Sequence, residues 1–134
     1  MESRYPMHFH LLRDNCPQCY FTHSSIHRSF YRAAVIQGTN ATQVTQNVAY
    51  DIVGNAFCFM DGAEERNNLS FNLAAYIHWL GPEPASIAGR ESVAFDQTDT
   101  LAFPADTAAS GFFLPNGDNI IVGNAASGVS RSQG

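Results

Sequence analysis

Short runs of apolar residues alternate with turn residues along the whole chain. The apolar runs cover residues 33–36, 56–60, 73–77, 112–114 and 120–122. Glycine, asparagine and aspartate stand between the runs, as in Asp61-Gly62 and Gly123-Asn124. No long apolar stripe recurs at the helical spacing of about 3.6 residues. The pattern therefore predicts many short strands joined by tight turns.

Segments within the chain repeat the same order of apolar and polar positions. The segments SIHRSFYR, QVTQNVAY and NLSFNLAA begin at positions 25, 43 and 68, so their spacing is 18 and then 25 residues. Aligned, they give an apolar column of Ile26, Val44 and Leu69. They also give a polar column of Ser29, Asn47 and Asn72, to which the segment NIIVGNAA adds Asn124. The later segments AFCFMDG (56–62) and GFFLPNG (111–117) resemble each other as well.

This period, with stacked aliphatic residues and an asparagine column, predicts a solenoid of β-coils. Aliphatic side chains would stack inside the solenoid from one coil to the next. An asparagine at a corner tolerates a left-handed backbone and can hydrogen-bond to its equivalent in the next coil. We expect an all-β solenoid of about three to four coils. A β-sandwich remains the alternative, because short strands alone do not exclude it.

The chain is expected to form one domain, residues 1–134, with one long loop. Residues 80–110 are rich in proline, aspartate and alanine and are expected to leave the solenoid as an insertion. A solenoid needs capping segments, and neither end of this sequence has one by pattern. We therefore expect a partial solenoid, a fragment of a longer array.

The charge and the hydropathy of the chain exclude some classes of binding partner. Of 134 residues, 45% are hydrophobic and 14% are charged, and the net charge is −5. This balance argues against nucleic-acid binding and against a polybasic membrane patch, both of which need a basic surface. The sequence has no run of apolar residues long enough to span a bilayer, and MESRYPMHFH is not a signal peptide by pattern.

Three cysteines leave several interpretations open. Cys16 and Cys19 form a CPQC sequence, and Cys58 stands alone. The pair is expected to occupy a surface turn, either free or disulfide-bonded as in a secreted protein. Zinc binding and redox chemistry are the alternatives, although a lone CxxC lacks the further ligands or the βαβ context that these need.

Three stretches carry a family resemblance. They are YPMHFHL (5–11), SIHRSFYRAAVIQGTN (25–40) and NVAYDIVGNAFCFMDGAEERN (47–67). Together they resemble the right-handed parallel β-helix region of the cell-surface hyaluronidase family, which includes the cell migration-inducing hyaluronan-binding protein, transmembrane protein 2 and fibrocystin-L. The segment GFFLPNGDNIIVGNAASG (111–128) is similar to a later part of that region, whereas residues 14–22 and 80–110 do not match.

The resemblance implies a right-handed β-helix in an extracellular or cell-surface protein, usually preceded by a G8 domain, which this sequence lacks. It implies hyaluronan or a related polysaccharide as ligand. Two functions remain open. The first is a fragment that binds polysaccharide or scaffolds a surface without catalysis of its own. The second is part of a hyaluronidase-like glycosidase that acts only in the full-length protein.

Three positions depart from the family pattern. Relatives commonly carry histidine at the positions of Gln37 and Asn55, and glutamate at the position of Met60. Glutamine and asparagine still hydrogen-bond but do not titrate near neutral pH, and methionine cannot act as a general acid. These departures favour the interpretation without catalysis.

Histidines supply the candidate metal or catalytic group. His8 and His10 are two residues apart, so on a strand both imidazoles would lie on one face. His27 is one coil later and is expected to approach them. A divalent metal, calcium or zinc, is the candidate cofactor, and the structural alternative is that these side chains pack a coil corner.

Carboxylates follow the apolar run 56–60. Asp61 and Glu64 are the candidate pair for glycoside hydrolysis, which requires two carboxyl groups about 5–9 Å apart. With Glu65 they also offer hard oxygen ligands for calcium. The alternative is a hydrogen-bonded turn in which Asp61 and Gly62 form the corner and the two glutamates are solvated.

Two sequons predict N-glycosylation. They are Asn40-Ala41-Thr42 and Asn68-Leu69-Ser70, with Asn40 and Asn68 as the acceptors. Both fall at predicted turns, which suits a secreted protein.

Overall fold

A computed structural model describes residues 5–78 and 109–130, which form twelve strands and no helix. The strands fall into four successive coils of three. The first coil holds β1 (Met7–Arg13), β2 (Tyr20–Thr22) and β3 (Ser25–Ser29). The second holds β4 (Ala34–Thr39), β5 (Gln43–Thr45) and β6 (Val48–Val53). The third holds β7 (Asn55–Phe59), β8 (Asn68–Ser70) and β9 (Leu73–His78), and the fourth holds β10 (Ser110–Phe113), β11 (Ile120–Val122) and β12 (Ala125–Ser130).

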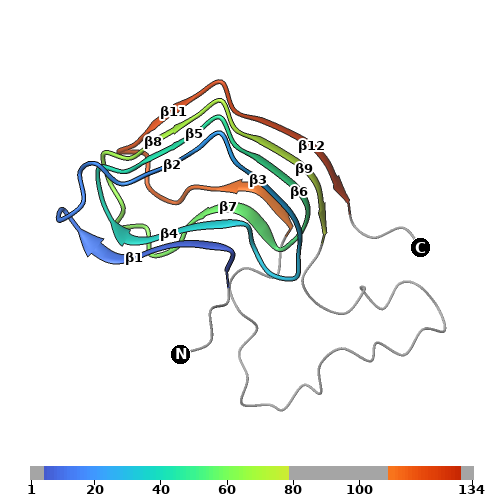
Figure 1. The fold of residues 1–134 in the computed structure, drawn as a ribbon, viewed down its shortest axis with the longest axis horizontal. Coiled ribbons are helices and arrows are strands. Elements are labelled where there is room, and N and C mark those ends of the chain that lie inside the picture. Colours follow the sequence, from blue (N-terminus) through green and yellow to red (C-terminus); the bar gives the residue numbers. More distant parts are fainter. Residues whose placement is uncertain (1–4, 79–108, 131–134) are drawn as a thin grey trace, which may run out of the picture.

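Equivalent strands of successive coils pair in parallel and build three sheets. Sheet A has the order β1-β4-β7-β10, sheet B the order β2-β5-β8-β11, and sheet C the order β3-β6-β9-β12. Figure 1 shows the coils stacked from blue to red, each strand above its equivalent. A sandwich would instead consist of antiparallel sheets. The structure therefore confirms the predicted parallel β-helix over the β-sandwich.

The register confirms the repeat in the later coils and corrects it in the first. Val44 pairs with Leu69, and Ala125 pairs with Leu73, as the alignment predicts. Ile26, however, pairs with Ala49, so its alignment with Val44 is wrong. The spacing between the first two coils is 23 residues, as between Thr22 and Thr45, and not 18. The apolar spacing of Ile26 and Phe30 imitates the repeat, but Phe30 is 92% exposed.

Apolar columns fill the interior. Val44 and Leu69 are fully buried, as are Ile52 and Ile77 in the neighbouring column. On sheet A the rings of Phe57 and Phe112 stack with centroids 5.2 Å apart. Each fully buried side chain of this size contributes about 1.5–3 kcal/mol. Stacking of like residues therefore stabilises each coil-to-coil contact.

An asparagine ladder runs along the corner between sheets B and C. The Oδ1 atom of Asn72 accepts hydrogen bonds from the backbone N–H and from the Nδ2 of Asn47, both at 3.0 Å. The Oδ1 atom of Asn124 accepts the same two bonds from Asn72. Each Nδ2 also donates to a backbone carbonyl in the preceding coil, as from Asn72 to Val44 of β5 at 2.8 Å. The predicted asparagine column is confirmed at these positions, but Ser24, and not Ser29, occupies its first position.

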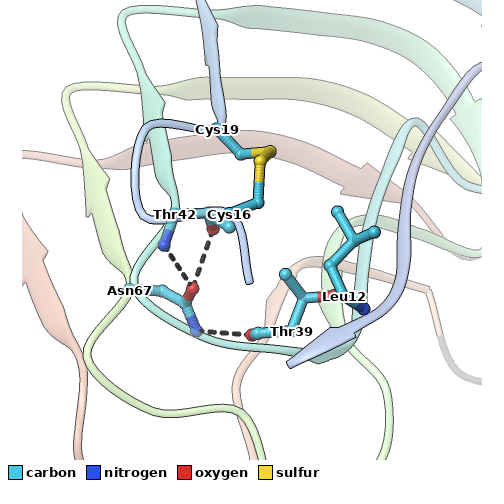
Figure 2. Close-up of a disulfide and its surroundings, with 6 residues drawn as sticks. All are labelled: Leu12, Cys16, Cys19, Thr39, Thr42 and Asn67. Atoms are coloured by element: carbon cyan, nitrogen blue, oxygen red, sulfur yellow. Dashed lines mark hydrogen bonds between the residues drawn. A yellow bond between two sulfur atoms is a disulfide. The ribbon is translucent and has the colours of Figure 1, made fainter. Parts of the chain in front are cut away.

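A second ladder lies at the other end of sheet B. The Oδ1 atom of Asn67 accepts bonds from the backbone and hydroxyl of Thr42, at 2.9 and 2.8 Å. Its Nδ2 donates to the carbonyl of Thr39 (Figure 2) and to the Oδ1 of Asn119. The three-residue strands β5, β8 and β11 of sheet B are thus held by side-chain ladders at both ends.

Cys16 and Cys19 form a disulfide in the turn between β1 and β2 (Figure 2). The backbone N–H of Gln43 donates to the carbonyl of Cys19 at 3.0 Å, so the turn is tied to the second coil. The sequence leaves open whether this pair is free, disulfide-bonded, zinc-binding or redox-active, and in the structure it is disulfide-bonded. Cys58 is free and buried.

The long loop predicted for residues 80–110 falls almost entirely on 79–108, which lie outside the described residues. Its last residue, Ser110, belongs to β10. Within the described parts of the chain, no helix has the length and apolar character needed to cross a membrane.

We predict that Asn72→Ala lowers the free energy of unfolding by roughly 3 kcal/mol, because it removes the side-chain partners of two backbone groups, the N–H of Asn47 and the carbonyl of Val44. The measurement is denaturant unfolding followed by circular dichroism. Asn15→Ala is the matched control. Asn15 is exposed, so its substitution should change the free energy of unfolding little. Equal stability of the two variants would contradict a supporting role for the ladder.

Candidate functional site

The outer face of sheet A carries a set of polar side chains from three successive coils. His8 and His10 are exposed on β1, and their ring centroids lie 4.8 Å apart. Strand alternation directs Met7 and Phe9 to the core instead. The prediction that the two imidazoles share one face is confirmed.

Gln37 of β4 links these histidines to the third coil. The Nε2 of His8 lies 3.2 Å from the Oε1 of Gln37, and the Nε2 of Gln37 donates to the Oδ1 of Asp61 at 3.4 Å. His10 is the register partner of Gln37. We call His8, His10, Gln37 and Asp61 the outer polar row. It offers hydrogen-bond donors and acceptors along the axis of the β-helix.

The pKa of His8 lies below its usual value of 6.5. Partial burial is the largest cause, and the positive charges of His10 and Arg32 act in the same direction, whereas the hydrogen bond to Gln37 opposes them. His8 is therefore mostly neutral at physiological pH. Neutral imidazole can both donate and accept a hydrogen bond but attracts anions weakly.

Glu64 is fully buried, and it is not the solvated side chain that the turn interpretation expects. Its Oε1 accepts bonds from the backbone N–H of Gly38 at 2.9 Å and of Asp61 at 3.1 Å. Its Oε2 is buried without a hydrogen-bond partner among the described residues. Glu64 thus holds the turn that presents Asp61, which is exposed. Glu65 is half-buried and pairs with Arg66 at 2.7 Å.

Asn55 and Cys58 lie buried in β7, beneath this region of the surface. The Oδ1 of Asn55 accepts a bond from the hydroxyl of Ser110 at 2.8 Å. Burial raises the pKa of the Cys58 thiol to about 11, so it stays protonated at neutral pH. A protonated, buried thiol is a poor nucleophile and a poor metal ligand.

The structure does not bring His27 to the other two histidines. His27 lies in the same coil as His8 and His10, and not one coil later, but on β3 of sheet C, whereas the other two lie on sheet A. In the parts of the chain that the structure describes, no group of three or more His, Cys, Asp or Glu side chains is placed to hold a metal ion. This geometry lends no support to the calcium or zinc hypothesis.

Both sequon asparagines are half-buried and hydrogen-bonded. Asn40 donates to Asp14 at 3.2 Å and accepts from the backbone of Glu65 at 3.1 Å. Asn68 begins β8 and accepts a bond from Ser70. The hydroxyl of Thr42, the third residue of the first sequon, is committed to a ladder bond. Glycosylation at Asn40 and Asn68 stays a prediction.

One further pair, a histidine beside a carboxylate, is not predicted by the sequence pattern. The Nε2 of His78 lies 2.7 Å from the Oδ1 of Asp51, on sheet C. The two residues are 27 positions apart and belong to no motif, so only the register of the coils places them together.

Comparisons with known proteins agree with this architecture. The family model described as CEMIP beta-helix matches residues 1–133. Protein rliB of Dictyostelium discoideum is 41% identical over 128 residues, which is 96% of this chain and 11% of that protein. A G8 domain-containing protein of the same organism is 42% identical over the same share of each chain. Mouse fibrocystin-L is 34% identical over 94% of this chain and 2% of its own length. The chain therefore spans 11% or less of these relatives, and no solved structure matches it.

We predict that native protein at about pH 8 reacts with iodoacetamide at Cys58 at least a hundredfold more slowly than protein unfolded in guanidinium, because the thiol is buried and protonated. Mass spectrometry of the tryptic peptide that contains Cys58 measures the rate. Fast labelling of folded protein would contradict the buried placement of β7.

Proposed function

The chain belongs to the CEMIP beta-helix family, and we propose that it forms the β-helix of a larger extracellular or cell-surface protein. In that setting it binds polysaccharide or scaffolds a surface, without catalysis of its own. The family match and the G8 domain-containing relative support the larger setting. The disulfide between Cys16 and Cys19 supports an oxidising compartment, because such bonds are rare in the reducing cytosol.

The observation that carries the binding function is the outer polar row. Its hydrogen bonds cross from β1 to β4 and on to Asp61 after β7. Neighbouring strands in a sheet lie about 4.8 Å apart, so polar groups recur along the axis at a fixed interval. A linear polymer laid along the axis can therefore meet a donor or acceptor at each coil.

The same residues disfavour catalysis. Glu64 accepts two backbone hydrogen bonds beneath the surface, which commits one of its oxygens to the fold. Gln37, between His8 and Asp61, cannot exchange a proton near neutral pH. The row thus has one exposed carboxylate beside two imidazoles, and a glycosidase of the usual kind needs two working carboxyl groups.

The second candidate function is a hyaluronidase-like glycosidase completed by other parts of the full-length protein. Asp61 favours it, because this carboxylate is exposed and linked through Gln37 to His8. Such an enzyme would draw its second acid from outside the residues described.

Electrostatics set the conditions for an acidic ligand such as hyaluronan. The net charge of −5 and the carboxylate of Asp61 repel a polyanion. Burial lowers the pKa of His8 below its ordinary value. The side chain therefore gains its positive charge only at a lower pH than an exposed histidine does. Attraction to an acidic polysaccharide therefore increases as pH falls through the His8 pKa.

We expect hyaluronan to bind the full-length protein several-fold more tightly at about pH 5 than at about pH 7.5. His8→Gln removes part of this dependence, because glutamine hydrogen-bonds but does not acquire charge. His23→Gln is the matched control, since His23 is exposed in the turn between β2 and β3. Affinity electrophoresis at a series of pH values measures the effect. A dependence that is identical in both variants would contradict a role for His8.

We expect the full-length protein to leave the chain length of hyaluronan unchanged over a day, with or without added calcium or zinc, as measured by size-exclusion chromatography. Shortening that disappears in Asp61→Asn or His10→Ala would contradict the non-catalytic proposal and establish the glycosidase alternative. Shortening that persists in both variants would place catalysis outside this β-helix.

A further inference from the structure

The outer face of sheet C carries an exposed apolar strip that the outer polar row does not use. Val48 and Tyr50 of β6 are 39% and 51% exposed, and Leu73 and Tyr76 of β9 are 38% and 47% exposed. Val48 pairs in register with Leu73, so the strip crosses from one coil to the next. In a globular protein a contiguous exposed apolar surface marks an interaction site more often than isolated residues do.

Two tyrosine rings form a platform at the centre of this strip. The centroids of Tyr50 and Tyr76 lie 5.9 Å apart, and the ring planes are within 30° of each other. The edge of the His78 ring meets Tyr76 at a centroid distance of 4.2 Å. The two rings are thus in contact with each other, and each tyrosine remains about half exposed to solvent.

A residue with left-handed backbone stands at the same register position in both strands beside these rings. Tyr50 pairs in register with Ala75, and not with Tyr76. Tyr76 follows Ala75 with a left-handed φ of 56°, and Asp51 has the same conformation in the preceding coil. The left-handed residue interrupts the regular alternation of side chains, so Tyr50 stands just before this position and Tyr76 stands at it. An aromatic residue in the left-handed region costs roughly 1–2 kcal/mol, which glycine at this point would avoid. Gly128 holds the equivalent conformation in the fourth coil.

Polar groups border the platform. Asp51 and His78 are joined at 2.7 Å, which fixes both side chains beside the rings. His27 of β3 pairs in register with Tyr50. Arg28 is the one arginine or lysine in β3, β6 and β9, and Asp51 is their one carboxylate, so these strands carry little net charge. Carboxylate and imidazole groups are well suited to hydrogen-bond the hydroxyls of a sugar.

We propose that the outer face of sheet C is a second glycan-binding site, in which Tyr50 and Tyr76 stack against the rings of a neutral, β-linked pyranose chain. Pyranoses with equatorial hydroxyls present flat C–H faces, and these pack on aromatic rings. Asp51 and His78 bond hydroxyls at the edge of the sugar. A polyanion is not the ligand here, because the border offers no excess of positive charge.

This site goes beyond the function proposed for sheet A. It lies on a different sheet, uses stacking in place of a polar row, and takes a neutral ligand. A protein partner is the competing occupant of any exposed apolar strip. The stacked rings with a fixed polar border favour a sugar. The strongest contacts between proteins more often lie in apolar pockets from which the surrounding residues exclude water.

The test uses the full-length protein with cellohexaose as the neutral probe and a hyaluronan oligosaccharide of matched length as the acidic probe. Isothermal titration calorimetry measures the dissociation constants. We expect Tyr76→Ala and Tyr50→Ala each to weaken cellohexaose binding by tenfold or more. Tyr76→Phe, which keeps the ring, retains most of the affinity. Tyr20→Ala is the matched control, because Tyr20 is 70% exposed on sheet B.

Each outcome separates this site from the outer polar row. Cellohexaose binding that persists in Asp61→Asn and is lost in Tyr76→Ala supports the site, whatever hyaluronan does. Absence of cellohexaose binding, or equal affinity in Tyr76→Ala and Tyr20→Ala, overturns it. A change of oligomeric state in Tyr76→Ala without glycan binding also overturns it in favour of a protein contact. Thermal melting of each variant shows that the fold is retained.

Discussion

The hydrogen bond that a backbone N–H donates to the asparagine Oδ1 of the next coil is the interaction on which the rest of this structure depends. Sheet B has strands of three residues, too short to fix a register through backbone pairing alone. The chain turns at each end of these strands. The backbone N–H and C=O groups of the turns are outside the sheet and need other hydrogen-bond partners. The ladders through Asn72 and Asn67 supply those partners and lock each coil one strand spacing from the next.

Because the coils are locked in register, side chains from distant parts of the sequence recur in columns. Inward columns exclude water and stabilise the stack. Outward columns are free to vary, and the outward faces of sheets A and C differ in chemistry. Sheet A presents imidazole, amide and carboxylate groups in the row from His8 to Asp61. Sheet C presents the stacked rings of Tyr50 and Tyr76. A rigid array with a fixed axial repeat suits a linear polymer ligand, since little conformational entropy is lost on binding.

The sequence alone predicts the architecture, because asparagine and aliphatic residues recur at the spacing of one coil. It places Asn72 and Asn124 correctly for that reason. It misplaces the first coil, because Ile26 and Phe30 copy the apolar spacing of the repeat while Phe30 faces solvent. The site is less predictable. Strand alternation places His8 and His10 on one face, but which sheet His27 occupies depends on a register that the sequence pattern misassigns.

The most direct test of the ladder as the organising constraint is hydrogen exchange of individual amides in the full-length protein, measured by NMR or mass spectrometry with residue resolution. We predict that the turn amides of Asn47 and Asn72, which donate to ladder oxygens, exchange as slowly as the amide of Leu69 in the middle of β8. Fast exchange at Asn47 and Asn72, with slow exchange at Leu69, would show that the sheets hold the stack without the ladder and would contradict the account.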